Sequence, residues 1–196
     1  MQVNEIRKEA NYSGIRVTLT GELSGARCYV QIDVGFGDAV TPGPEEITYP
    51  LLVEGLPAPA LLAYPKDTVV AEKFEAMVSL GMANSRMKDY FDIWVLAHNL
   101  EFDGCILQEA IRATFKRRAT PIPKKLPLAL SDEFSGDSQK LILWDAFLKK
   151  NAIDAVSLAE VVTELREFLL PLTEKLADDT SYSDVWVLGG SWTPVG

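Results

Sequence analysis

The stretch of residues 71–96, AEKFEAMVSLGMANSRMKDYFDIWVL, predicts two consecutive helices that carry charges on apolar faces. Lys73 has only apolar residues three and four positions away, so a helix surrounds its ammonium with packing side chains. Asp89 and Asp92 lie three residues apart, on the side of the second helix that also carries its apolar stripe. Charges facing a packed surface are costly unless they are paired, bind a ligand or take part in chemistry. Lys73, Asp89 and Asp92 are therefore candidate site residues.

The composition indicates an ordinary globular protein, with 47% of its 196 residues hydrophobic and 24% charged. Its formal net charge of −9 argues against non-specific nucleic-acid binding by the whole surface. No apolar run approaches the length of a membrane span, and residues 1–10 lack signal-peptide character, so we expect a cytoplasmic protein with no membrane partner. Cys28 and Cys105 fit no metal spacing and are expected to be buried thiols in a reducing compartment.

The N-terminal quarter of the chain follows a strand pattern. Apolar and polar residues alternate over residues 15–19 and 28–34, and Gly21 and Gly25 between them predict the turn of a hairpin. A loop rich in glycine and proline comes next. A short third strand is expected over residues 47–53.

Beyond this region the periodicity becomes helical. The expected helices span residues 67–80, 85–99, 103–118, 138–150 and 157–176. Their predicted N-caps are Asp67, Ser85, Asp103 and, through an S-x-x-E capping box with Glu160, Ser157. On the fourth helix, the side chains expected to face inward are those of Leu141, Trp144, Phe147 and Leu148. The tail after residue 177 has no clear periodicity, so both a packed strap and a frayed end remain open.

The predicted fold class is α+β, with a small mixed or antiparallel sheet followed by a helical bundle. We expect three regions: a β-rich part at residues 1–64, helices with the lysine and aspartate motifs at 65–118, and a C-terminal helical region with its tail at 119–196.

Each charged candidate also has a structural explanation. A single lysine on an apolar face commonly extends its ammonium into water. Acidic residues are favoured near a helix N-terminus, and Asp92 also lies four residues after Lys88, a spacing that allows an ion pair. Asp33, in mid-strand, suits the solvent face of a sheet. Considered one by one, these residues are more often structural than catalytic.

Several familiar site types do not fit this sequence. With one histidine and no cysteine cluster, a zinc site or a Ser-His-Asp triad is not expected. No GxxxxGK[ST] loop occurs, and no GxGxxG follows a strand. The basic residues at 116–118 and 124–125 are in reach of phosphate, but we favour a solvated helix end whose cations complement the helix dipole.

Taken together, the motifs resemble the AbiEii/AbiGii-type nucleotidyltransferase toxin family. In TVVAEKFEAMVSLGMANSRMKDYFDIWVLA, an AEK-x-x-A helix is followed by an R-x-K/R-D-[FY]-x-D-[LI] helix, as in that family. Upstream, VQIDVGFGD resembles the strand with the family's third carboxylate, and YPLLVEGLPAPALLAYP resembles the approach to the lysine helix. The resemblance covers nearly the whole chain and is densest over residues 64–97.

The resemblance implies transfer of a nucleoside monophosphate from a nucleoside triphosphate (NTP) to an acceptor, either tRNA or a protein. It also implies Mg²⁺ ions held by three carboxylates, and a cognate antitoxin as partner. Asp33 would be the metal-binding third carboxylate and Lys73 the contact to the triphosphate. Asp89 would be the catalytic acid of its motif, as a base or in orienting the substrate.

The remaining motif residues have supporting roles in this interpretation. Asp92, grouped with the catalytic residues, would act as a structural partner through Lys88 or Arg86. Arg86 and Lys88 are expected to contact the nucleotide together with Lys73.

One departure from the family pattern lowers the transferase activity that we expect of this chain. Family members carry a Gly-Gly-Ser/Thr turn and an Asp-x-Asp strand upstream of these motifs, and no such pair precedes Asp33 here. The GGS at residues 189–191 lies too late in the chain to serve. We therefore expect weak Mg²⁺ binding and little transferase activity from this chain alone. Two alternatives stay open: a non-catalytic pseudo-nucleotidyltransferase that binds a nucleotide or a partner, and a scaffold in which the charges form only a core ion-pair network.

Overall fold

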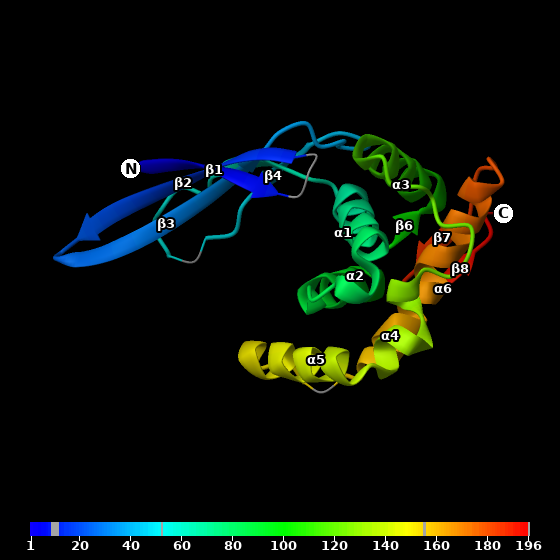
Figure 1. Cartoon of the computed structure of the whole chain (residues 1–196). Helices are drawn as coiled ribbons and strands as arrows, with labels where there is room; N and C mark the ends of the chain where they lie inside the picture. Colours follow the sequence, from blue (N-terminus) through cyan, green and yellow to red (C-terminus); the bar gives the residue numbers. More distant parts are fainter. Residues whose placement is uncertain (9–11, 52, 155, 196) are drawn as a thin grey trace. The chain divides into compact units, whose positions relative to one another are not determined.

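The computed structural model describes residues 1–8, 12–51, 53–154 and 156–195 (Figure 1). The chain forms two compact units, Met1–Asp38 and Ala39–Gly196, and each is described by itself. Within the described residues the fold is α+β, with small antiparallel sheets and six α-helices, which confirms the predicted fold class. None of the helices in these residues is long and apolar enough to cross a membrane.

The first unit is a three-stranded antiparallel sheet in the order β1-β2-β3. Its strands are β1 (Gln2–Lys8), β2 (Tyr12–Leu23) and β3 (Ala26–Gly35). The β2–β3 hairpin confirms the predicted one, but the turn is shorter than expected. Ser24 and Gly25 form it, both with positive φ, whereas Gly21 lies inside β2 and pairs with Cys28.

The second unit starts with a two-stranded sheet and continues with helices. The third strand predicted over residues 47–53 overlaps β4 (Glu45–Thr48), which pairs with β5 (Ala60–Ala63); position 52 of the predicted range lies outside the described residues. The helices that follow are α1 (Lys66–Leu80), η1 (Gly81–Ala83), α2 (Met87–Asn99), α3 (Gly104–Arg118), η2 (Leu128–Leu130), α4 (Asp132–Gly136), α5 (Ser138–Asn151) and α6 (Leu158–Ala177). Aromatic side chains from five of these helices, fully buried, fill much of the core: Phe74, Tyr90, Phe115, Phe134 and Phe168.

Two of the predicted helix caps were wrong. Helix α1 begins directly after Pro65, so Asp67 lies inside its first turn and is buried rather than capping. Before α2, the side-chain oxygen of Asn84 accepts a hydrogen bond from the backbone N–H of Arg86 at 2.8 Å. This buried asparagine, and not Ser85, orders the entry to α2.

The other predicted helix signals are confirmed. Asp103 accepts hydrogen bonds from the backbone N–H groups of Cys105 and Ile106 at the start of α3. Ser157 and Glu160 form the reciprocal capping box of α6. These motifs depend only on residues within one helical turn.

Two predictions about side-chain burial were wrong. Cys28 and Cys105 are both exposed rather than buried. On α5, Trp144 and Leu148 are buried as expected, whereas Leu141 is 42% exposed.

The C-terminal tail forms a packed sheet. β6 (Phe102–Asp103), β7 (Val185–Val187) and β8 (Ser191–Thr193) pair as an antiparallel sheet in the order β6-β7-β8. The indole N–H of Trp186, on β7, donates to the carbonyl of Ala97 at the end of α2, at 2.7 Å. The strap alternative is therefore the one that the structure supports.

Candidate functional site

The candidate residues lie on two neighbouring helices of the second unit. Lys73 is at the middle of α1, while Asp89 and Asp92 are in the first two turns of α2. Helix α1 turns its apolar side inward because Val70, Phe74 and Met77 repeat at helical spacing and are fully buried. Lys73 lies between these positions, among the apolar neighbours that the sequence predicted, and its ammonium reaches α2.

The structure brings Lys73, Asp89 and Asp92 into direct contact. The Lys73 ammonium lies 2.7 Å from Oδ1 of Asp89 and 2.8 Å from Oδ2 of Asp92. The three side chains are 20%, 15% and 24% exposed, respectively. Lys88 also contacts Oδ2 of Asp92 from its position four residues earlier, as its spacing suggested. The four residues form one charge cluster between α1 and α2.

The hydrogen bonds within the cluster favour the charged forms of Lys73 and Asp92. Burial alone lowers the pKa of Lys73, but its hydrogen bonds to Asp89 and Asp92 reverse this effect and hold the pKa above its ordinary value. Burial likewise opposes ionisation of Asp92, yet hydrogen bonds from Lys73 and Lys88 leave the pKa of Asp92 below its ordinary range. At neutral pH these groups are a protonated lysine and an ionised aspartate.

The cluster retains unused hydrogen-bonding capacity. An ammonium has three donors, and within the described residues Lys73 uses two of them. Asp89 binds Lys73 through Oδ1, which leaves Oδ2 without a partner in the same residues. The arrangement can therefore still donate one hydrogen bond to an anion and accept one proton.

The opposite side of α1 is fixed to the end of α3. Arg118 lies 3.3 Å from Glu72 and 2.6 Å from the buried Glu75, and Thr120 donates to the other oxygen of Glu75. Arg118 is only 22% exposed, so the predicted solvated basic end does not include it. Lys116, by contrast, is exposed as expected.

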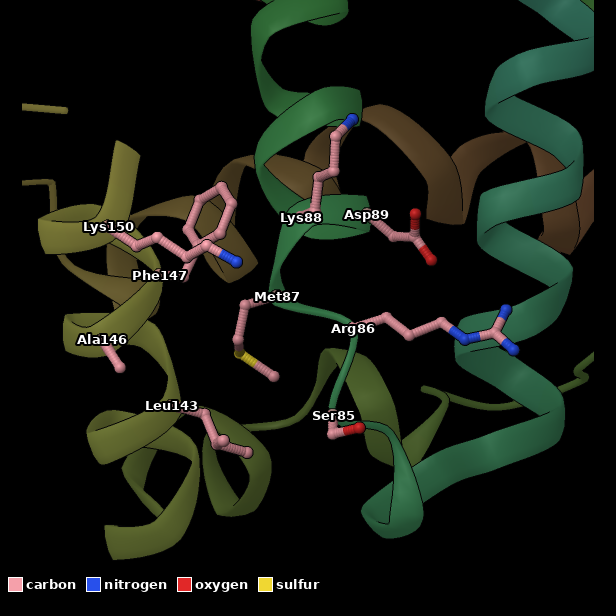
Figure 2. A pocket seen from close by; sticks show the side chains of 9 residues that line it. All are labelled: Ser85, Arg86, Met87, Lys88, Asp89, Leu143, Ala146, Phe147 and Lys150. Carbon is pink, nitrogen blue, oxygen red and sulfur yellow. The ribbon is translucent and has the colours of Figure 1, made fainter. Parts of the chain in front are cut away.

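Next to the charge cluster is an open cleft of about 610 Å³ (Figure 2). One wall is residues 85–89 at the start of α2, and the other is Leu143, Ala146, Phe147 and Lys150 of α5. Figure 2 shows that Arg86 and Asp89 extend to the same side, toward α1, whereas the α5 residues lie across the cleft. Asp89 therefore belongs both to the cleft and to the charge cluster.

The sequence interpretation missed Lys140, a buried lysine that supports this region. Its ammonium donates to the carbonyls of Met82 and Asn84 at 2.6 and 2.8 Å and lies over the Phe134 ring. The helical spacing could have predicted its burial, because Lys140 lies four residues before Trp144 on the buried face of α5. Lys140 fixes the segment that leads into α2.

Asp33 belongs to the first unit, whereas the charge cluster belongs to the second. Arg16 on the adjacent strand holds both of its carboxylate oxygens, at 2.7 and 2.8 Å. Among the residues that the structure describes, no three or more His, Cys, Asp or Glu side chains are grouped to hold a metal ion. Those residues do not by themselves fit the Mg²⁺ site implied by the resemblance.

Comparison with known families gives one result. A family model described as "Nucleotidyl transferase AbiEii toxin, Type IV TA system" matches residues 2–165. No curated protein and no solved structure matches significantly. The matched range contains the charge cluster and both walls of the cleft.

Proposed function

The chain belongs to the AbiEii nucleotidyltransferase toxin family of type IV toxin–antitoxin systems, and from this premise we propose that it transfers a nucleoside monophosphate from an NTP to an acceptor hydroxyl. The observation that supports this assignment most directly is the charge cluster. It combines a lysine with a spare donor and an aspartate with a spare acceptor, beside a cleft large enough for a small molecule.

The proposed reaction is an in-line displacement at phosphorus. The acceptor oxygen forms a bond to the α-phosphorus, the bond from that phosphorus to the oxygen bridging the β-phosphate breaks, and pyrophosphate leaves. The hydroxyl proton passes to Oδ2 of Asp89. The third N–H of Lys73 donates to a phosphate oxygen and offsets the charge that develops there.

Further charged side chains have supporting roles in the proposal. Arg86 forms no ion pair within the described residues and extends to the side of Asp89, where it is placed to contact the phosphates (Figure 2). Lys88 contributes positive charge while pairing with Asp92. Asp92 orients Lys73 toward Asp89 through its 2.8 Å contact.

Mg²⁺ remains a proposal for this chain, with Asp33 as its carboxylate ligand. When bound, the metal would supply Lewis-acid stabilisation of the phosphates. The described residues do not complete such a site, so no step above depends on it. We propose accordingly that the 196 residues alone transfer little nucleotide. If transfer is absent altogether, the chain is a nucleotide-binding or partner-binding module of the same family.

The acceptor is proposed to be tRNA or a protein, and a cognate antitoxin is the proposed protein partner. Both follow from membership of a toxin–antitoxin nucleotidyltransferase family. The geometry of the cluster suits any hydroxyl acceptor that can reach Asp89.

NTP-dependent thermal stabilisation of the purified chain tests the proposal. We expect an NTP to raise the melting temperature, since a ligand that binds only the folded state stabilises it. Lys73→Ala should abolish the shift, and Arg86→Ala, which changes an exposed side chain, should weaken it. Lys149→Ala is the matched control, because Lys149 is exposed and lies outside the cleft.

The outcomes separate the three hypotheses. No stabilisation by any NTP would contradict the proposal and leave only an ion-pair scaffold. Stabilisation without transfer of labelled nucleotide to tRNA would support the binding-module alternative. Robust transfer that is lost in Lys73→Ala would show that the chain alone is catalytically competent, contrary to our expectation.

A further inference from the structure

The cleft beside the charge cluster has two chemically different surfaces. Its apolar surface comes from Met87, Leu143, Ala146 and Phe147. Phe147 is half-buried, and its ring is held by Phe91 and Trp144, at centroid distances of 5.6 and 5.7 Å. A ring fixed on its inner side and still partly open is ready to receive a flat ligand.

The polar part of the cleft is mainly cationic. It contains Arg86, Lys88 and Lys150 but a single acidic side chain, Asp89. Asp89 is already paired with Lys73, and Lys88 with Asp92. Within the described residues, Lys150 has no ion-pair partner, so it has positive charge left to offer an anion in the cleft. Arg86 has no ion-pair partner there either, but its guanidinium extends toward α1 (Figure 2). In Figure 2 the Lys150 side chain reaches from α5 toward the start of α2.

A ligand that matches both surfaces carries a flat, largely apolar group and a phosphate. We propose that the cleft between α2 and α5 binds the nucleoside end of the NTP, with the base against Phe147 and Lys150 contacting the phosphates. This inference rests on the proposed function. It assigns to α5 a role in substrate recognition, with Phe147 and Lys150 as binding residues.

The positions of the cleft and the charge cluster also predict the orientation of the bound nucleotide. Asp89 lines the cleft, but its carboxylate extends toward α1 and bonds to Lys73, so a nucleotide with its base at α5 passes its phosphates over the start of α2 to reach the charge cluster (Figure 2). A cleft of about 610 Å³ lies within the common range for small-molecule sites, about 300–1,000 Å³. Because the cleft is open to solvent, it has room for one nucleotide without enclosing it.

A bulky substitution on the exposed surface of α5 provides the sharpest test. Ala146 is exposed and lines the cleft, so Ala146→Phe fills the proposed base site without entering the core. We expect it to weaken ATP binding, measured by titration calorimetry, about tenfold or more, the order of one lost stacking contact. Binding of inorganic triphosphate, which has no base, should be unchanged.

The contribution of the Lys150 ammonium to phosphate binding is tested separately. Lys150→Ala should weaken binding of both ATP and inorganic triphosphate, whereas Lys149→Ala, its neighbour outside the cleft, should affect neither. If Ala146→Phe leaves ATP affinity intact while Lys73→Ala abolishes it, the cleft is not the base site and the proposed function stands. If the unmodified chain binds neither ligand, both the proposed function and this inference fail. If Ala146→Phe abolishes binding of a single-stranded RNA but not of ATP, the cleft belongs to the acceptor and the inference is overturned.

Discussion

Replacing Lys140 tests, with an expected magnitude, whether its hydrogen bonds to the segment before α2 stabilise the region of the charge cluster. Its side chain is 6% exposed, and its ammonium bonds to two backbone carbonyls rather than to a carboxylate. Asn84, whose backbone carbonyl accepts one of these two hydrogen bonds, also accepts a hydrogen bond from the backbone N–H of Arg86 through its side-chain oxygen. The substitution Lys140→Met keeps an unbranched side chain one atom shorter and removes the terminal charge with its donors.

The expected loss follows from the contacts. Hydrogen bonds that involve a charged group contribute about 1.5–3 kcal/mol each, and a cation over a ring adds about 0.5–1 kcal/mol. Against this, methionine removes the cost of burying an ammonium, which offsets part of these contributions. Because the carbonyl of buried Asn84 loses its partner, we expect a net loss of about 2–4 kcal/mol. For a unit of this size the melting temperature should fall by about 5–12 °C.

Thermal and urea unfolding of the whole chain measure this effect, with Lys149→Met as the control on the same helix. Lys149 is exposed, so its substitution should change the free energy of unfolding by less than about 0.5 kcal/mol. Equal stability of the two variants would refute the assignment of Lys140 as the support of the α2 entry.

Three further changes have expected outcomes in urea unfolding. Gly104→Ala should cost about 1–3 kcal/mol, because its Cβ would lie 2.5 Å from the Asp184 carbonyl oxygen and from the Tyr182 ring. Glu75→Ala should cost about 3 kcal/mol, since the partly buried guanidinium bonded to Glu75 loses its closest carboxylate. Asp92→Asn should destabilise the protein at pH 7, and this deficit should shrink as the pH falls below the ordinary aspartate pKa of about 4. The pKa of Asp92 is depressed on folding, so its contribution is present above its ordinary pKa, about 4, and disappears as the pH falls through the folded value.

Each of these changes has a matched control. Gly136→Ala adds a Cβ with no atom within 4 Å and should be nearly neutral. Glu167→Ala, at an exposed position of α6, and Asp145→Asn, at an exposed position of α5, should each change stability by less than about 0.5 kcal/mol. Losses in the controls as large as those in the test variants would show that the named contacts are not the cause. A stability deficit of Asp92→Asn that stays constant as the pH is lowered from 7 to well below 4 would contradict the ion-pair explanation.

Local signals predicted much of this fold. The Ser157–Glu160 capping box and the Asp103 cap were recognisable because each motif lies within one helical turn. The position of Lys73 among apolar neighbours, together with the aspartates on the next helix, also predicted residues that the structure brings together.

The features that the sequence left open or missed depended on distant partners. Strand β7 is only three residues long, and its pairing with β6 is invisible to any local pattern. Lys140 was overlooked because its partners, the carbonyls of Met82 and Asn84, lie 58 and 56 residues away and are backbone groups with no sequence signature. The helical spacing could predict that Lys140 lies on the buried face of α5, but not that it binds the segment leading into α2.

The pairing of β6 with β7 affects the order in which the second unit can form during synthesis. The Trp186 indole reaches the Ala97 carbonyl across 89 residues, and Trp186 itself is buried against Phe168. A nascent chain that has emerged only as far as α6 therefore exposes the apolar surface that Trp186 later covers. Contacts of such long sequence separation form late. Until residues 185–187 leave the ribosome, the nascent chain should be a better client for chaperones than the finished protein.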